Sequence, residues 1–162
     1  MATDMFLKID GIKGESKDHK HKDEIHIESF SWGLAQTGAF GTGGGGGAGK
    51  VSVHDVSVTK MVDKSTPELM IHCCNGKHIP EGWLYFRKAG GESVLEYLKI
   101  QMCDMLVSGV QEAGHGGGDL LSESLTVNFS KFKVFYQEQD EKGKPQGGPV
   151  TMGWAVKENQ KW

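Results

Sequence analysis

The chain has little cysteine and no long apolar run. Its 162 residues include only three cysteines. Because that count is odd and Cys73 is adjacent to Cys74, we expect reduced thiols rather than a disulfide framework. No run of roughly 18 uncharged apolar residues occurs, so no membrane-spanning helix is predicted. The segment Met1–Ser16 also lacks the apolar core of a secretory signal. The sequence therefore predicts a protein made and folded in the cytoplasm, without membrane insertion.

The chain also lacks a strong excess of charge of one sign. Lysine and arginine number 18 against 21 aspartates and glutamates, which gives a net charge of -3. Nucleic acids and anionic lipids are recruited by a basic field, so neither partner is predicted. The composition, 37% hydrophobic and 24% charged, fits one domain over residues 1–162 that is large enough to bury a core.

Recognisable catalytic and metal-binding patterns are missing as well. There is no Gly-x-Ser-x-Gly nucleophile turn. Two thiols and two imidazoles do lie within one short segment, at His72, Cys73, Cys74 and His78. Adjacent cysteines on a helix point about 100° apart, however, and the Cys-x-x-Cys spacing of a zinc site is absent. We therefore expect small buried thiols flanked by solvated histidines in this segment, no metal, no cofactor and no catalytic residue, and predict that the protein is not an enzyme.

Glycine, in contrast to cysteine and proline, is abundant in the chain. The chain has 24 glycines beside four prolines. The glycines concentrate in residues 38–49, 114–118 and 143–148. Glycine runs cost much backbone entropy to order without a partner. These three segments are therefore predicted to be long connections between strands.

The first glycine-rich segment ends in a near match to a phosphate-binding loop. Gly44, Gly49 and Lys50 have the Gly-x-x-x-x-Gly-Lys spacing whose backbone amides cradle phosphates. The Mg²⁺-binding Ser/Thr that should follow is Val51, and the residues beyond it alternate like a strand rather than opening a helix. A small nucleotide- or phosphate-binding protein using Gly44–Lys50 is the alternative function, which a nucleotide titration would test.

Alternating apolar residues predict a mainly β fold. The segments Val94–Gln111 and Leu120–Glu138 each run nearly twenty residues, about 60 Å if straight, which is too long for a domain of this size. The alternation changes phase after Ile27, Val53 and Phe129, as it does at a β-bulge. We expect two sheets that close as a distorted β-barrel with one flanking α-helix and long inter-strand loops.

The one clear helix is predicted to begin at Thr66. That residue can cap it, Pro67 suits the first turn, and Gly76 fits the C-terminal turn. Its apolar side chains form two stripes, one of Leu69 with Cys73 and the other of Met70 with Cys74. The helix should therefore pack on the barrel, with Lys60, Asp63 and Lys64 placed to form an ion pair near its start.

Several segments, in order along the chain, resemble one known family. They are Met5–Ile9, Gly14–Asp18, Ser31–Gly33, Val51–Lys60, Val62–Leu69, Arg87–Gly91 and Gly147–Trp154. Together they are similar to the haemolysin-coregulated protein (Hcp) family, the tube subunit of the type VI secretion system. The resemblance covers essentially the whole chain and leaves no residues for an added domain.

The resemblance implies an assembly and a set of partners. Hcp-like protomers form a homo-hexamer, a ring with a wide central hole, and the rings stack into a hollow tube. The implied partners are the VgrG spike, the contractile sheath that drives the tube outward, and effector proteins sheltered in the lumen. The protein would reside in the bacterial cytoplasm and then be secreted through the type VI system without a signal peptide.

The resemblance also assigns two regions. In the family an extended loop reaches from one ring toward the next, and here it comprises Gly38, Gly41, Gly43, Gly44, Gly45, Gly46, Gly47, Gly49 and Lys50. Ser31 lies on a strand that the family places along the lumen. Its parity is opposite to that of Phe30 and Trp32, so it is predicted to contact effectors if those two pack in the core. A β module without assembly is the remaining alternative, and a sizing column would exclude it.

Overall fold

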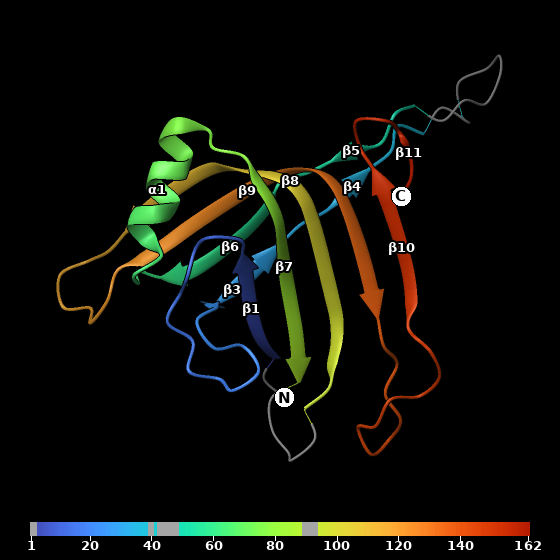
Figure 1. Ribbon diagram of the computed structural model, residues 1–162, viewed down its shortest axis with the longest axis horizontal. Coiled ribbons are helices and arrows are strands. Elements are labelled where there is room, and N and C mark those ends of the chain that lie inside the picture. The colour runs from blue at the N-terminus through green and yellow to red at the C-terminus, as the bar shows by residue number, and fades with distance from the viewer. Residues whose placement is uncertain (1–2, 39–40, 42–48, 89–93) are drawn as a thin grey trace.

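The computed structural model describes residues 3–38, 41, 49–88 and 94–162, and within these residues the regular structure is strand apart from one helix (Figure 1). In chain order the elements are β1 (Thr3–Ile9), β2 (Ile25–Ile27), β3 (Ser29–Ser31), β4 (Leu34–Ala35), β5 (Ser52–Val53), β6 (Val56–Met61), α1 (Thr66–Asn75), β7 (Ile79–Lys88), β8 (Glu96–Ala113), β9 (Ser122–Tyr136), β10 (Val150–Ala155) and β11 (Gln160–Lys161).

Nine of these strands form one antiparallel sheet that curls on itself. Seven of them follow the order β11-β10-β9-β8-β7-β1-β2, and β6 and β3 are added along β9. This is possible because β9 divides one edge between two partners: residues 122–127 pair with β6, and residues 131–136 pair with β10. β3 pairs with β6, whereas β2, separated from β3 only by Glu28, pairs with β1. The β2–β3 segment thus joins the two sides of the curled sheet (Figure 1).

The predicted class, mainly β with one flanking helix, is confirmed. The nine strands form one curled sheet that strand pairing does not close, rather than the two sheets of a distorted barrel. At Glu28 the chain leaves β2, which pairs with β1, and enters β3, which pairs with β6. β4 and β5 form a separate two-stranded sheet.

The two long strands predicted from the sequence are β8 and β9, and they pair along nearly their whole length. Their ladder shifts register between Val107 and Gly109. Asp104, also on β8, has a left-handed φ of 52° and no paired partner in either neighbouring ladder. Irregularities of this kind bend a strand, which explains how such long strands fit into one small domain.

The three changes of phase from which bulges were predicted arise in two different ways. Near Phe129 the strand β9 runs unbroken while its buried side changes phase, so that Phe132 is the next fully buried residue. After Ile27 and after Val53, by contrast, one strand ends and another begins with a different partner. The prediction of bulged strands at those two points is wrong, because a change of partner also restarts the alternation.

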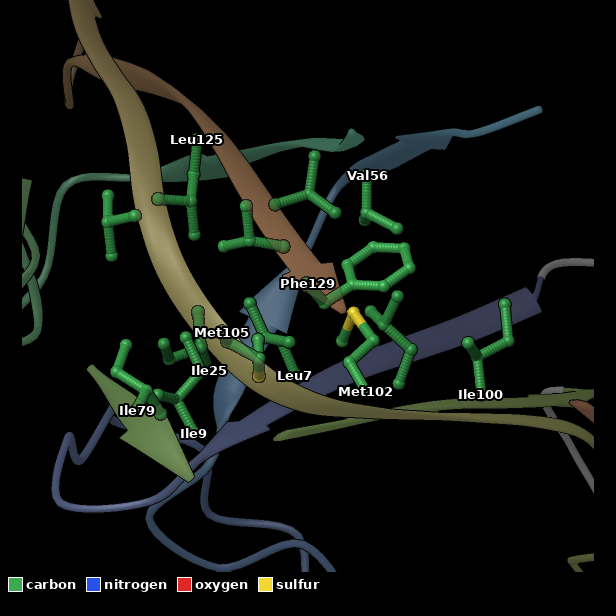
Figure 2. Close-up of a cluster of buried hydrophobic side chains, with 14 of the residues drawn as sticks. Leu7, Ile9, Ile25, Val56, Ile79, Ile100, Met102, Met105, Leu125 and Phe129 are labelled. Carbon is green, nitrogen blue, oxygen red and sulfur yellow. The ribbon is translucent and has the colours of Figure 1, made fainter. Parts of the chain in front are cut away.

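The hydrophobic core fills the inside of the curled sheet. Figure 2 shows side chains from several strands converging there, among them Leu7, Ile25, Met105 and Leu125. Each is at most 1% exposed, and burial of such a side chain stabilises the fold by about 1.5–3 kcal/mol. Because strand side chains alternate, the residues between these core positions point away from the core.

Helix α1 begins and ends where the sequence predicts, with Pro67 in its first turn and Gly76 in a left-handed turn at its end, φ 61°. Ser65 rather than Thr66 is the N-cap residue. The Thr66 hydroxyl is turned inward instead, where it accepts from the Asp63 amide at 3.2 Å and lies 3.2 Å from Oε2 of Glu123.

One of the two predicted apolar stripes of α1 faces the core. Leu69 is fully buried and Cys73 packs against the core cluster, as predicted. The second stripe is wrong, because Met70 and Cys74 are exposed, and the helix buries Thr66 and His72 besides Leu69. No helix in the described ranges combines the length and the apolarity needed to cross a bilayer.

His21 fixes the charged loop between β1 and β2 to the sheet. It is 3% exposed and lies between two carboxylates, with Nδ1 2.6 Å from Glu24 and Nε2 2.5 Å from Glu96 on β8. Its ring stacks on Phe6, with 4.4 Å between centroids. Burial lowers the pKa of His21, but the hydrogen bonds and charges of Glu96 and Glu24 outweigh burial and raise that pKa overall. The hydrogen bond from His21 lowers the pKa of Glu96.

We expect replacement of His21 by glutamine to destabilise the protein chiefly at mildly acidic pH. Because the pKa of His21 is raised in the folded state, His21 contributes its full stabilisation below pH 6.5, the ordinary pKa of histidine. This contribution is lost as pH rises through the pKa of the folded state. Because the pKa of Glu96 is lowered in the folded state, Glu96 contributes stability above pH 4.5, and this contribution is lost as pH falls through its folded-state pKa. The loss of unfolding free energy should be about 2 kcal/mol near pH 6 and smaller at about pH 9, as measured by chemical denaturation.

The exposed His19 of the same loop provides the control. His19→Gln should leave the unfolding free energy nearly unchanged at both pH values, because surface substitutions have small effects. A loss for His21→Gln that is equal at both pH values would contradict a charged imidazole between the two carboxylates.

Candidate functional site

Ser31 lies on the outer side of β3, away from the core. Ser29 and Ser31 are both exposed, whereas Phe30 between them packs against the core cluster. Trp32 packs against the same cluster. The prediction for Ser31 required that Phe30 and Trp32 both point inward, and both do. Ser31 is therefore free to contact another molecule.

The register of the neighbouring strands places Ser31 within a surface of short hydroxyl side chains. One row crosses β3, β6 and β9 through Ser31, Ser57 and Thr126. The next row crosses the same strands through Ser29, Thr59 and Ser124. We call these six residues the hydroxyl face. Within it, the hydroxyl oxygens of Ser29 and Thr59 are 2.5 Å apart, and the row between them is the core row of Phe30, Val58 and Leu125.

A hydrogen-bonded cluster continues the hydroxyl face at one end. Asp55 accepts from Ser108 Oγ at 2.7 Å and from Asn128 Nδ2 at 2.8 Å, and Ser108 Oγ lies 3.0 Å from Thr126 Oγ1. Gly109, paired with Thr126, leaves room for this arrangement, because a Cβ there would lie 2.7 Å from the threonine hydroxyl oxygen. The carboxylate at the edge of the face is thus already bound by two donors of the chain itself.

The chemistry of the hydroxyl face is that of hydrogen bonding. Serine and threonine hydroxyls both donate and accept, so they can bond to the varied polar groups of a polypeptide. Within residues 3–38, 41, 49–88 and 94–162, no three His, Cys, Asp or Glu side chains gather where they could hold a metal ion. The arrangement suits weak contact with a macromolecule.

The histidines and cysteines of α1 do not converge on one point. His72 is buried, and its Nδ1 donates to the Glu68 carbonyl of its own helix at 2.7 Å. Cys74 is exposed, and the exposed His78 lies 3.0 Å from Asp104. The expectation that small buried thiols lie between solvated histidines is therefore wrong for His72 and Cys74.

The predicted ring-stacking loop is described only near its two ends. Gly38, Gly41, Gly49 and Lys50 are described, whereas Gly43, Gly44, Gly45, Gly46 and Gly47 lie outside the described residues. The two ends come from β4 and β5, which pair with each other (Figure 1). Lys50 leads toward strand β5 and not into a helix, so the alternative phosphate loop lacks the helix N-terminus that would face the anion.

An open cavity of about 460 Å³ lies at the base of this loop. It is lined by Leu34, Gln36, Gly49, Val51, Val53, Phe132, Met152, Trp154 and Asn159. Leu34 and Met152 are 47% and 45% exposed. Exposed apolar side chains gathered around a cavity mark a surface suited to contact with another protein.

Sequence reasoning missed a buried row of charged side chains. The predicted ion pair of Lys60 with Asp63 is present at 3.1 Å, but Lys60 also contacts Glu123, and both of these side chains are 0% exposed. Glu112 lies opposite Glu123 on the neighbouring strand. One signal was available, because Lys60 follows Val56 and Val58 in the alternation and therefore occupies a core position.

Comparison with known proteins identifies the family. Residues 6–136 match the family described as "Type VI secretion system effector, Hcp". The chain is 52% identical to Protein hcp1 of Pseudomonas aeruginosa over 159 residues, which are 98% of each chain. These matches define a protein of the type VI secretion system.

Solved structures agree with the sequence matches. Hcp1 from Salmonella typhimurium is 37% identical, with a TM-score of 0.80 over 100% of both chains. A type VI secretion system effector from Yersinia pestis is 33% identical, with a TM-score of 0.77 over 94% of this chain and 100% of that chain. The chain belongs to the Hcp family, which confirms the resemblance found in its sequence.

Proposed function

We propose that the protein is the structural subunit of a type VI secretion tube. Six copies form a ring, the rings stack into a hollow tube, and the hydroxyl face lines the lumen, where effectors are carried. Membership of the Hcp family supports the general role, and the hydroxyl face is the observation that supports the lumen assignment.

The hydroxyl face has the physical properties that a conduit needs. Its side chains are short and uncharged, so little side-chain entropy is lost when cargo touches them. It offers hydrogen bonds without an apolar patch that would hold cargo tightly. Two of the strongly exposed apolar side chains, Val150 at 71% on β10 and Leu34 at 47% on β4, lie on strands outside the hydroxyl face. We assign those to contacts between copies.

The loop Gly38–Lys50 is proposed to connect one ring to the next. Its root lies beside the apolar cavity between Leu34 and Met152, which offers a surface for a neighbouring ring. A weak contact repeated around a ring becomes strong through avidity. The other proposed partners are the VgrG spike, the contractile sheath and the effectors. The protein acts without catalysis, in the cytoplasm before the system fires and outside the cell afterwards.

Replacement of Ser31 by glutamine should weaken effector binding while the ring persists. The longer side chain projects from the hydroxyl face and leaves Phe30 and Trp32 in the core, so stability should change by less than about 0.5 kcal/mol. We expect binding of at least one effector to fall about ten-fold or more, corresponding to about 1.4 kcal/mol. Pull-down or calorimetry with purified effectors measures the change.

Thr151→Gln is a matched control, because Thr151 is also an exposed hydroxyl residue on a strand but lies on β10, outside the hydroxyl face. It should bind effectors like the wild type. Unchanged binding of every effector by Ser31→Gln, with intact rings, would count against the lumen assignment.

A further inference from the structure

Three charged side chains lie next to one another on the core side of the sheet. Lys60 on β6 is paired with Glu123 on β9, and Glu123 is paired with Glu112 on β8. Thr66 of α1 lies over the row, with its hydroxyl 3.2 Å from Glu123 Oε2 and 3.4 Å from the Lys60 amine. The row therefore joins three strands and the start of the helix.

The row contains one lysine but two carboxylates on the strands. Lys60 contacts Oε2 of Glu123 and also lies 3.1 Å from Asp63. Both carboxylate oxygens of Glu112 and Oε1 of Glu123 are shielded from solvent and have no hydrogen-bond partner among the described residues. Buried polar atoms of this kind are costly unless they are paired. A proton on Glu112 removes the problem, because it can be donated toward Glu123 and cancels the repulsion of two adjacent carboxylates.

We propose that Glu112 and Glu123 share a proton and form a pH-sensitive latch at the root of the β8–β9 hairpin. With the proton in place the two strands are held together where they end. When the proton leaves, two buried negative charges face each other across the ladder and only one of them has Lys60. The ends of β8 and β9 then separate more readily.

The latch lies beside an apolar hairpin tip. The connection between β8 and β9 carries Leu120 and Leu121, which are 61% and 51% exposed, and it extends from the sheet below α1 in Figure 1. The Leu121 carbonyl accepts from the Val62 amide at 3.0 Å, so the tip is tied to the segment that leads from β6 to the helix. Loosening of the hairpin root would change where these two leucines are presented.

The direction of the pH effect follows from the groups around Glu112. Burial, then the hydrogen bond and charge of Glu123, raise the pKa of Glu112 to about 7 against the opposing charge of Lys60. Asp63, before α1, reaches the same lysine, and the one titratable side chain that α1 buries is His72, bonded within its own helix. A carboxyl with a raised pKa binds a proton in the folded state that the unfolded chain releases, so the latch weakens as pH rises from 4.5 toward 7 and above.

Nuclear magnetic resonance of the full-length protein tests the latch. The carboxyl carbon of Glu112 should titrate with a midpoint near pH 7. Amide exchange at Ala113 and Ser122, corrected for the intrinsic rate, should rise about ten-fold from pH 6 to pH 8, as expected for a group that loses its proton over that interval. In Glu112→Gln the amide can still donate to Glu123 but cannot titrate, so the corrected exchange should stay constant.

Glu158→Gln, an exposed change far along the chain, serves as the control and should exchange like the wild type. A midpoint for Glu112 near 4.5, the ordinary value, would overturn the proposal. So would a pH-dependent exchange at Ala113 and Ser122 that persists unchanged in Glu112→Gln.

Discussion

Replacing Lys60 by methionine is expected to lower the free energy of unfolding by about 3–5 kcal/mol, the usual cost of removing one partner of a buried ion pair. Glu123 is 0% exposed, and in the variant its buried carboxyl group would lose the lysine that neutralises it. Glu112, which lies opposite it on the next strand, carries no positive charge that could replace the lysine. Chemical denaturation at about neutral pH measures the loss, which should appear as a lower midpoint with little change in slope.

Two variants separate the buried pair from a general effect of lost charge. Lys64→Met removes an exposed lysine close in sequence and should change stability by less than about 0.5 kcal/mol. The double variant Lys60→Met with Glu123→Leu replaces the pair by apolar side chains and should recover most of the loss. A Lys60→Met protein as stable as the Lys64→Met protein would show that Lys60 carries no buried charge interaction.

Shortening Gly43–Gly47 to two residues is expected to abolish tube stacking and secretion and to leave ring mass and thermal stability nearly unchanged. The proposal gives this segment a role between rings and none in the fold of one subunit. Ring mass is measured by sedimentation, tubes by electron microscopy, and secretion by the protein content of culture supernatants.

A variant of unchanged length controls for the altered sequence. Substituting serine at Gly44 and Gly46 keeps the reach of the loop and should allow stacking. Normal tubes formed by the shortened protein would show that the loop is a passive connection between β4 and β5.

The fold could be predicted from the sequence where a local pattern decides it. The lengths of β8 and β9, the position of α1 with Pro67 and Gly76, and the outward direction of Ser31 all follow from alternation and capping. The breaks after Ile27 and Val53 could not be distinguished from bulges, because a change of strand partner and an extra residue produce the same shift of phase.

The candidate site was predictable only in part, because it depends on register. Ser31 could be placed on the outer side of its strand, but the six-residue hydroxyl face appears only when β3, β6 and β9 are aligned. The same holds for Glu112 and Glu123, which are eleven positions apart and look like two ordinary surface charges until the hairpin pairs them. Lys60 differs, because its place after Val56 and Val58 in the alternation was a signal of burial that the sequence reasoning did not use.

Sedimentation velocity of the purified full-length protein tests the proposed assembly most directly. At micromolar concentration the proposal predicts a main species of about six times the 17.7 kDa chain mass, with larger species where rings stack. A single monomeric species at that concentration, with nothing larger, would contradict the assignment of this chain as a ring-forming tube subunit.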